Sequence, residues 1–373
     1  MMVPFARMLL MLGFCLLAQR SMAQTDTLIR WWNPMKGSFS AIEGQAWPTE
    51  VGQPFSRLPE RAKKTVTEAV WNLSKNSTGL IVRFKTNAAQ ITIRYVVEAP
   101  IAFPHMPATG VSGIDLYGVK NDGSYLWCAG KYSFKDTIQF RFTDLKPLEH
   151  DTISGIEYRL HLPLYNTVKW LEIGVPKEKT FVPLKVREKK PIVVYGTSIA
   201  QGACASRPGM AWTAILSRKT NTPLINLGFS GTGRLDESVI SLINELDAGV
   251  FILDCLPNLT GFKEDDIYNR ITSAVKNIRT SHPKTPIVLT DHFGYTDAPI
   301  NPVKRAAYLK INTINHKAFA DLKSQGIRHI SILSKKELGQ DMDTMVDGTH
   351  PTDLGMLRYA NAYYKHLNEI GWK

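Results

Sequence analysis

The chain has 373 residues, of which 44% are hydrophobic and 21% charged, the proportions of a globular protein long enough for two domains. No low-complexity tract, heptad run or repeat is present, so coiled coils and solenoids are excluded. The formal net charge is +12, but lysine and arginine are spread along the chain without long runs, so the sequence does not indicate a nucleic-acid-binding surface.

Residues 1–23 have the pattern of a secretory signal peptide. Arg7 precedes a short apolar run, and the small residues Ser21 and Ala23 mark a cleavage site. This run is too short to span a bilayer, and no later segment is long enough for a transmembrane helix. We therefore expect cleavage after Ala23 and export to the periplasm or the extracellular medium.

Removal of this segment would leave Cys128, Cys204 and Cys255. Three scattered thiols indicate neither a disulfide framework nor a metal site, although one disulfide could form among them. The sequence also lacks the HxH and HExxH patterns and a run of metal-binding carboxylates. We expect no metal ion and no other cofactor.

Residues 24–185 show the periodicity of short antiparallel strands. Segments such as "GLIVRFKT", "QITIRYVV" and "TIQFRFTD" are rich in β-branched and aromatic residues, and several alternate apolar with polar positions. Turn residues such as Asn121–Gly123 separate them. The pattern predicts a β-sandwich of two packed sheets. Glu60–Val70 could be one short helix or a polar loop.

Residues 186–373 show a different periodicity. Near-continuous apolar runs ("PIVVYG", "PLINLGF", "AGVFILDCL", "PIVLTDHF" and "IRHISIL") alternate with helical segments. Runs of this kind are typical of parallel strands that are covered on both faces. We therefore predict a doubly wound α/β domain, in which ligands bind at the carboxyl ends of the strands.

Three of these predicted strand ends carry residues suited to acyl-transfer chemistry. Ser198 follows the first strand and could be a nucleophile or only a helix N-cap. Gly228, Gly231 and Gly233 crowd the end of the second strand, where glycines let backbone N–H groups approach a ligand. Asn258 follows the third strand, and its amide could donate to an oxyanion or simply form a turn.

The fifth strand is followed by "DGTHPTDLG", which begins at Asp347. Asp347 and His350 are close enough on one loop for the carboxylate to hold Nδ1–H of the imidazole. Nε2 would then be free to take a proton from a hydroxyl group. Serine needs such a base, because it is a poor nucleophile at its ordinary pKa.

Other polar residues near the strand ends are weaker candidates for substrate contacts. Asp291 and His292 follow the fourth strand, and Arg234 follows the glycines of the second. The first two could instead form a buried structural pair, and Arg234 could form an exposed ion pair.

Four blocks resemble those of the SGNH (GDSL-like) hydrolase family: "YGTSIAQG", "NLGFSGTG", "LDCLPN" and "DGTHPTDLG". The resemblance covers the chain from about Pro191 to its end and implies a flavodoxin-like three-layer domain. Two positions depart from the family pattern. Thr197 replaces the usual aspartate before the serine, and the third block lacks the common Gly-x-Asn-Asp form.

The resemblance also implies roles for individual residues. Ser198 would be the nucleophile, and Asp347 and His350 would complete a catalytic triad. The oxyanion hole would consist of the backbone N–H groups of Ser198 and Gly231 and the side chain of Asn258.

The segment "GIDLY" at Gly113–Tyr117 resembles the signature of a β-rich domain that precedes SGNH hydrolases in a group of exported bacterial proteins. Export, this domain and the family resemblance together suggest an esterase that removes small acyl groups, acetyl above all, from a poly- or oligosaccharide. Aromatic residues in the N-terminal half, such as Trp127, could stack on sugar rings or belong to the core. Two alternatives stay open: a lysophospholipase or other lipid esterase, and a carbohydrate-binding protein without catalytic activity.

Overall fold

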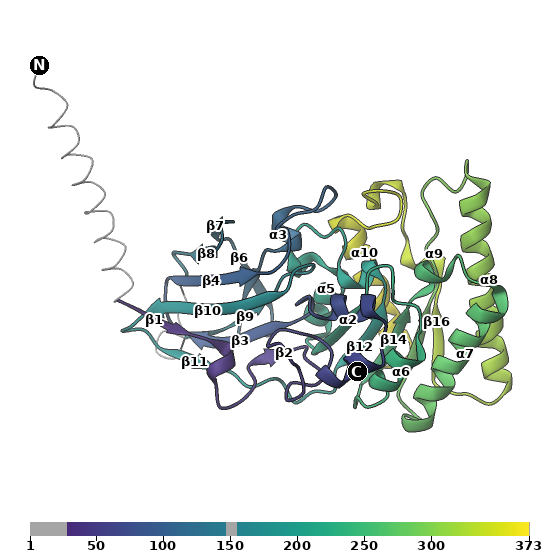
Figure 1. Cartoon of the computed structure of the whole chain (residues 1–373), viewed down its shortest axis with the longest axis horizontal. Coiled ribbons are helices and arrows are strands. Elements are labelled where there is room, and N and C mark those ends of the chain that lie inside the picture. The colour runs from purple at the N-terminus through teal and green to yellow at the C-terminus, as the bar shows by residue number, and fades with distance from the viewer. Residues whose placement is uncertain (1–27, 147–154, 373) are drawn as a thin grey trace, which may run out of the picture.

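A computed structural model describes residues 28–146 and 155–372. The predicted signal peptide lies outside these residues, so its cleavage and the export of the protein stay predictions. Within the described part of the chain, no helix combines the length and the apolar character needed to cross a membrane. Figure 1 shows a β-rich half at one end of the molecule and a parallel sheet flanked by helices at the other.

The N-terminal half contains two antiparallel sheets. The first has the order β1 (Ile29–Trp32), β10 (Val168–Pro176), β4 (Ile91–Val97), β8 (Ile138–Phe142), β7 (Lys131–Ser133). The second has the order β11 (Phe181–Pro183), β3 (Ile81–Thr86), β9 (Ile156–His161), β5 (Asp115–Val119), β6 (Tyr125–Cys128), with β2 (Ile42–Glu43) beside β3. Alternate residues of β4, Ile91, Ile93 and Tyr95, are fully buried in one cluster with Phe84 and Leu160 of the second sheet. This confirms the predicted β-sandwich.

The C-terminal half contains one parallel sheet with the order β13 (Leu224–Gly228), β12 (Ile192–Gly196), β14 (Val250–Asp254), β15 (Ile287–Thr290), β16 (Ile330–Leu333). One face is covered by α5 (Trp212–Thr220) and α10 (Asp353–Glu369). The other is covered by α6 (Glu237–Ile243), α7 (Glu264–Ser281) and α8 (Pro302–Ser324). The flavodoxin-like three-layer fold is thus confirmed. The strand order reverses at β12, and ligands bind at such a reversal.

Short helices connect these elements: α2 (Glu68–Ser74), α3 (Ala108–Val111), α4 (Ser198–Gln201) and α9 (Lys335–Leu338). There are also 3₁₀ turns at η1 (Pro34–Lys36), η2 (Glu60–Lys64), η3 (Pro208–Met210), η4 (Leu256–Leu259) and η5 (Met342–Thr344). The segment Glu60–Val70 is therefore neither one helix nor a simple loop. Its β-branched residues Thr65, Val66 and Thr67 separate η2 from α2, and the Thr67 hydroxyl caps α2 by accepting from Val70 N–H.

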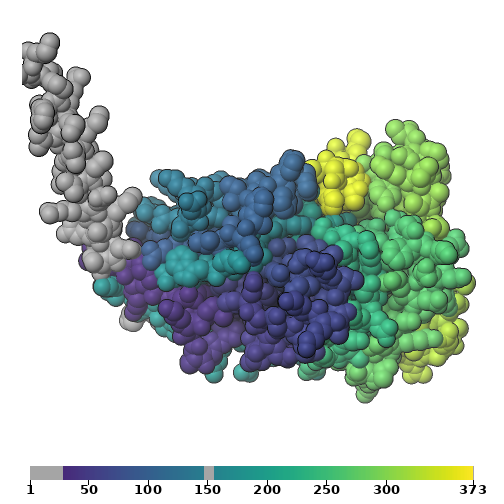
Figure 2. Space-filling model, in the orientation of Figure 1, coloured from purple at the N-terminus to yellow at the C-terminus, as the bar shows by residue number. Residues whose placement is uncertain are grey.

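The segment between β2 and β3 packs against both halves, since Phe55 is buried in the core of the sandwich and other residues pack against the parallel sheet. Leu58 and Val70 lie in the same hydrophobic cluster as Phe229 and α6. Arg57 is fully buried and donates hydrogen bonds to the carbonyls of Asn226 and Gly228, 3.0 and 2.7 Å away. Burial lowers the pKa of Arg57 to about 9, so the guanidinium stays charged at neutral pH. Figure 2 shows this segment, in dark blue, against the green surface of the C-terminal half.

The "GIDLY" segment is a second link between the two halves. The Asp115 carboxylate is only 4% exposed and accepts from Arg207 Nη1 (2.8 Å), Gly209 N–H (2.7 Å) and Trp127 Nε1–H (2.9 Å). Arg207 also donates to the Tyr117 hydroxyl, at 2.7 Å. Arg207 and Gly209 belong to the connection between α4 and α5, so the segment ties the sandwich to the chain that follows Ser198. The predicted boundary between residues 185 and 186 stays a prediction.

We expect Asp115→Ala to lower the free energy of unfolding by roughly 3–5 kcal/mol, because it leaves a partly buried guanidinium and two N–H donors without an acceptor. Urea unfolding followed by tryptophan fluorescence would measure the loss. The matched control is Asp136→Ala, at an exposed aspartate, with an expected change of about 0.5 kcal/mol or less. Equal stability of the two variants would show that Asp115 does not hold the halves together.

Candidate active site

Ser198 is the first residue of α4 and lies directly beyond the carboxyl end of β12. The N-cap of this helix is Thr197, whose hydroxyl accepts from Ile199 N–H at 3.3 Å, so the Ser198 side chain is not used for capping. The turn is tight: a Cβ added to Gly196 would lie 2.6 Å from the Ala200 Cβ. The sharp change of direction presents the Ser198 hydroxyl at the end of the sheet.

Ser198, His350 and Asp347 form a continuous hydrogen-bond chain. Ser198 Oγ lies 2.9 Å from His350 Nε2, and His350 Nδ1 lies 2.7 Å from Asp347 Oδ2. The other carboxylate oxygen of Asp347 accepts from the backbone N–H groups of Thr349 (3.0 Å) and His350 (2.8 Å). These two bonds fix the carboxylate within its own loop. The arrangement gives the imidazole an acceptor at Nδ1–H and a hydroxyl at Nε2.

The ionisation of Asp347 suits this arrangement. Partial burial would raise the pKa of its carboxyl group, but hydrogen bonds from the side chain and backbone of His350 and from Thr349 N–H outweigh that effect and hold the pKa below its usual value. The group is therefore an anion at neutral pH.

Asn258 contacts the loop that carries Gly231, and a part for both residues in an oxyanion hole stays a prediction. Gly231 follows β13 with φ of +68°, and no atom lies within 4 Å of the position that a Cβ would take. In one of the two possible orientations of the Asn258 carboxamide, its oxygen accepts hydrogen bonds from the N–H groups of Thr232 (3.2 Å) and Gly233 (3.1 Å). In this orientation the Asn258 NH₂ group is a donor directed away from Thr232 and Gly233.

Two positioning residues were not predicted from the sequence. Gln201 is fully buried, and its side-chain oxygen accepts from Ser230 N–H at 3.0 Å, which connects α4 to the loop that carries Gly231. The Tyr165 hydroxyl donates to the Ser198 carbonyl at 3.3 Å. The sequence offered no signal for these contacts, because both depend on which segments meet in three dimensions.

The N-terminal half also contacts the site through the loop before α3. Phe103 and Met106 exchange backbone hydrogen bonds of 3.0 and 3.1 Å, which places His105 at the tip of a tight turn. The His105 ring centroid lies 6.0 Å from that of Phe103 and 6.3 Å from that of His350. Figure 1 shows this loop beside the yellow loop that precedes α10. The sandwich therefore forms part of the surroundings of His350.

The three weaker candidates do not join the Ser198–His350 chain through any hydrogen bond among the described residues. Asp291 is buried and accepts from Asn315 and His316, each at 3.0 Å. His292 is also buried, and its Nδ1 accepts from the N–H of Gly294, which is only two residues further on. The Arg234 guanidinium lies 5.7 Å from the centroid of the Phe262 ring. A substrate contact for Arg234, Asp291 or His292 stays a prediction.

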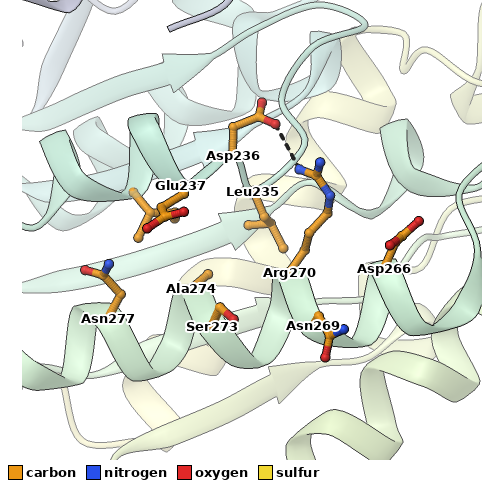
Figure 3. A pocket seen from close by; sticks show the side chains of 10 residues that line it. Leu235, Asp236, Glu237, Asp266, Asn269, Arg270, Ser273, Ala274 and Asn277 are labelled. Atoms are coloured by element: carbon orange, nitrogen blue, oxygen red, sulfur yellow. Dashed lines mark hydrogen bonds and ion pairs between the residues drawn. The ribbon is translucent and has the colours of Figure 1, made fainter. Parts of the chain in front are cut away.

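A separate cavity of about 370 Å³ lies between α6 and α7 (Figure 3). Arg270 on α7 pairs across it with Asp236 at 2.8 Å and donates to the Arg234 carbonyl at 2.8 Å. None of the residues that line the cavity belongs to the predicted triad. The contacts of Arg270 instead anchor the segment after Gly231 to α7 (Glu264–Ser281).

The cysteines and potential metal ligands give no further reactive group. Cys128, Cys204 and Cys255 are free. Glu337, His366 and Glu369 bring three potential ligand atoms within 4.8 Å of one another. The Glu337 carboxylate already caps α9, however, and Glu369 pairs with Lys365 at 3.6 Å. The expected absence of a metal ion stays a prediction.

Asp254 should make stability depend on pH. Burial raises its pKa to about 7, and a contact with Tyr363 offsets only part of this effect. Because the folded state favours the neutral acid, the contribution of Asp254 to the free energy of unfolding is fully present below the ordinary pKa of about 3.9. It is lost as the pH rises through 7.

Asp254→Asn, which is neutral at every pH, should therefore gain stability relative to wild type between pH 5 and pH 8, on the order of 2 kcal/mol. Thermal unfolding at both pH values tests this. An identical difference between variant and wild type at the two values would contradict it.

Comparison with known proteins places the chain in a family. The model of the GDSL-like Lipase/Acylhydrolase family matches residues 189–368. The model of the GxDLY domain, the N-terminus of Esterase_SGNH_hydro-type proteins, matches residues 29–181. A solved structure from Bacteroides ovatus, of a protein named as a GDSL-like lipase, is 31% identical, with a TM-score of 0.81 over 92% of this chain and 98% of that one.

Two more distant structures share the fold. A salicylyl-acyltransferase from a tetracycline biosynthetic pathway is 20% identical, with a TM-score of 0.70 over 92% of this chain and 98% of that one. An acetyl xylan esterase from the rumen bacterium Butyrivibrio proteoclasticus is 12% identical, with a TM-score of 0.54 over 92% of this chain and all of that one. No curated protein matches the chain. On the strength of the two family models and the Bacteroides ovatus structure, the chain belongs to the GDSL-like (SGNH) esterase family and carries the GxDLY type of N-terminal domain.

Proposed function

We propose that the protein is an exported serine esterase that removes small acyl groups, acetyl above all, from carbohydrate. The observation that carries the proposal is the chain Ser198 Oγ–His350 Nε2, His350 Nδ1–Asp347 Oδ2, with distances of 2.9 and 2.7 Å. A protein that only binds carbohydrate has no need of a serine hydroxyl aligned with a histidine–aspartate pair.

The reaction follows from this geometry. His350 takes the proton of Ser198 as Oγ attacks the ester carbonyl, while Asp347 holds Nδ1–H and stabilises the imidazolium. The N–H groups of Ser198 and Gly231 and the NH₂ group of Asn258 bind the oxyanion. His350 then protonates the departing sugar oxygen, which leaves as a hydroxyl group. In the second half, His350 takes a proton from the water that attacks the acyl-enzyme, and it returns this proton to Ser198 Oγ as the bond to the acid breaks.

Carbohydrate as the carrier of the ester is supported by the accessory domain and by the fold shared with an acetyl xylan esterase. Of the tryptophans in the N-terminal half, Trp127 is 51% exposed, whereas Trp47 is buried in the core. The Trp127 indole N–H is held by Asp115, so the ring is fixed in position. A fixed and exposed ring is a suitable platform for a sugar.

The chain length of the acyl group provides the test. We expect faster hydrolysis of p-nitrophenyl acetate than of the decanoate, and release of acetate from acetylated xylan. A preference for the decanoate would favour a lipid esterase instead. Failure to release any acid from esters of either length or from the polysaccharide would reject the esterase proposal.

A further inference from the structure

A second cavity, of about 440 Å³, opens at the carboxyl ends of β15 and β16. Its lining comes from the segment before α8, from α8 itself, and from α9 and the segment after it. Thr296 lines the cavity and also borders the loop of the predicted triad: a Cβ added to Gly348 would lie 3.0 Å from the Thr296 hydroxyl oxygen. Figure 1 shows the loops before α8 and before α10 rising from the same end of the sheet.

The lining combines aromatic rings with positive charge. Tyr295 and Tyr308 supply the rings, and Arg305 and Lys335 supply the cations. Among the described residues, Asp341 is the one acid in the lining. It is engaged in an ion pair with Arg358, outside the cavity, and the hydrogen bond from Arg358 holds the pKa of Asp341 below its usual value. The cavity therefore keeps an excess of positive charge.

Neither cation is neutralised within residues 28–146 and 155–372, because no carboxylate lies within ion-pair distance of Arg305 or Lys335. Lys335 Nζ lies 5.4 Å from the centroid of the Tyr308 ring. Gly294, with φ of +103°, makes room for the lysine stem, since a Cβ there would lie 2.9 Å from Lys335 Cε. The lysine stem is thus packed in place although the residue is exposed.

Two titratable groups close to Lys335, Asp291 and His292, lie outside the lining of the cavity. The Asp291 carboxylate is occupied by Asn315, by His316 and by the backbone N–H of Lys335. Burial, followed by the charge of Lys335, lowers the pKa of His292 to about 3, so this imidazole is neutral and adds no charge. The cavity offers two cations of its own, side by side with two tyrosine rings.

We propose that this cavity binds the carboxylate of a uronic acid residue next to the acylated sugar, which would make an acidic polysaccharide the substrate. The inference rests on the proposed function, whose active site it adjoins. Arg305 can bind a carboxylate through two parallel hydrogen bonds, and Lys335 adds a point charge. Tyrosine rings pack against sugar rings, and the volume is within the range of small-ligand sites. A sulfate ester has similar charge, and the test separates the two groups.

Binding is measured on the full chain with Ser198→Ala, so that no ester is turned over. Calorimetric titrations would compare oligogalacturonate, a neutral xylo-oligosaccharide and a sulfated oligosaccharide. We expect the oligogalacturonate to bind at least about tenfold more tightly than the neutral sugar, because charge-assisted hydrogen bonds discriminate by this much or more. The advantage should shrink at high salt.

The variant Arg305→Gln/Lys335→Gln, in the same background, should remove this advantage. The matched control is Lys336→Gln, which loses one charge from the same short helix at a position outside the cavity lining. It should leave the affinity for oligogalacturonate unchanged. Equal affinity for neutral and uronate sugars, or tighter binding of the sulfated one, would overturn the proposal, as would an undiminished affinity of the double variant.

The outcome is separable from that of the proposed function. Hydrolysis of neutral acetylated sugars without uronate binding would leave the esterase intact and reject the anionic subsite. Uronate binding that depends on Arg305 and Lys335, in a protein that hydrolyses no ester, would reject the esterase and retain the subsite.

Discussion

Ser198→Ala should reduce kcat on p-nitrophenyl acetate by about 10⁴–10⁶-fold, because the variant lacks the atom that forms the acyl-enzyme. Some acceleration over the reaction in water would survive, since the oxyanion donors and the binding site remain. The Ser198 hydroxyl is hydrogen-bonded to His350, and loss of this one hydroxyl should leave the fold and the melting temperature nearly unchanged. Steady-state rates and thermal unfolding of both proteins provide the measurement.

The control for this experiment is Ser273→Ala, at an exposed serine on α7 that belongs neither to the predicted triad nor to the predicted oxyanion hole. We expect it to retain activity within about tenfold of wild type, because the hydroxyl has no assigned part in the reaction. A rapid burst of p-nitrophenol in wild type, absent in Ser198→Ala, would identify the acyl-enzyme directly. If Ser198→Ala kept a tenth of the wild-type rate, another group would have to be the nucleophile.

Periodicity was sufficient to predict the fold. The apolar runs of the second half are strands whose residues are buried on both faces, such as Ile192–Gly196, because helices cover both sides of the sheet. Alternation in "QITIRYVV" likewise marked β4, whose inward residues form the core of the sandwich. Both patterns depend on local sequence alone, and for this reason they could be recognised without knowing how the chain packs.

The packing of the two halves against each other could not be predicted. Nothing in the sequence around Arg57 distinguishes a fully buried arginine, held by backbone carbonyls of β13, from a solvated one. The partners of Asp115 are similarly distant, since Arg207 lies 92 positions further along the chain. Such contacts depend on tertiary structure, and periodicity carries no information about them.

For the candidate site, the strand-end rule predicted where residues lie but not where their side chains point. It brought Ser198 and His350 to the same crevice, and the structure places their reactive atoms 2.9 Å apart. The same rule selected Asp291, whose carboxylate instead turns inward to meet Asn315 and His316 on α8. His105 was missed because it approaches from the sandwich, outside the set of strand ends.

Asp347→Asn should lower kcat by about 10⁴-fold at neutral pH while leaving the loop folded. The asparagine oxygen can still accept from the N–H groups of Thr349 and His350, which hold the loop in wild type. Its NH₂ group, in place of Oδ2, cannot accept from His350 Nδ1–H. It favours the tautomer with the proton on Nε2, which cannot take a proton from Ser198.

Asp343→Asn, at an exposed aspartate four positions earlier, controls for the loss of one negative charge and should keep the wild-type rate. Because the pKa of Asp347 is held below its usual value, the wild-type rate should not decline through protonation of this carboxyl above about pH 4. If Asp347 acts only through His350 on Ser198, the double variant Ser198→Ala/Asp347→Asn should be no slower than Ser198→Ala alone, since residues of one catalytic unit are not additive. Additive losses would mean that Asp347 acts outside this unit, by shaping the loop or by contacting the substrate.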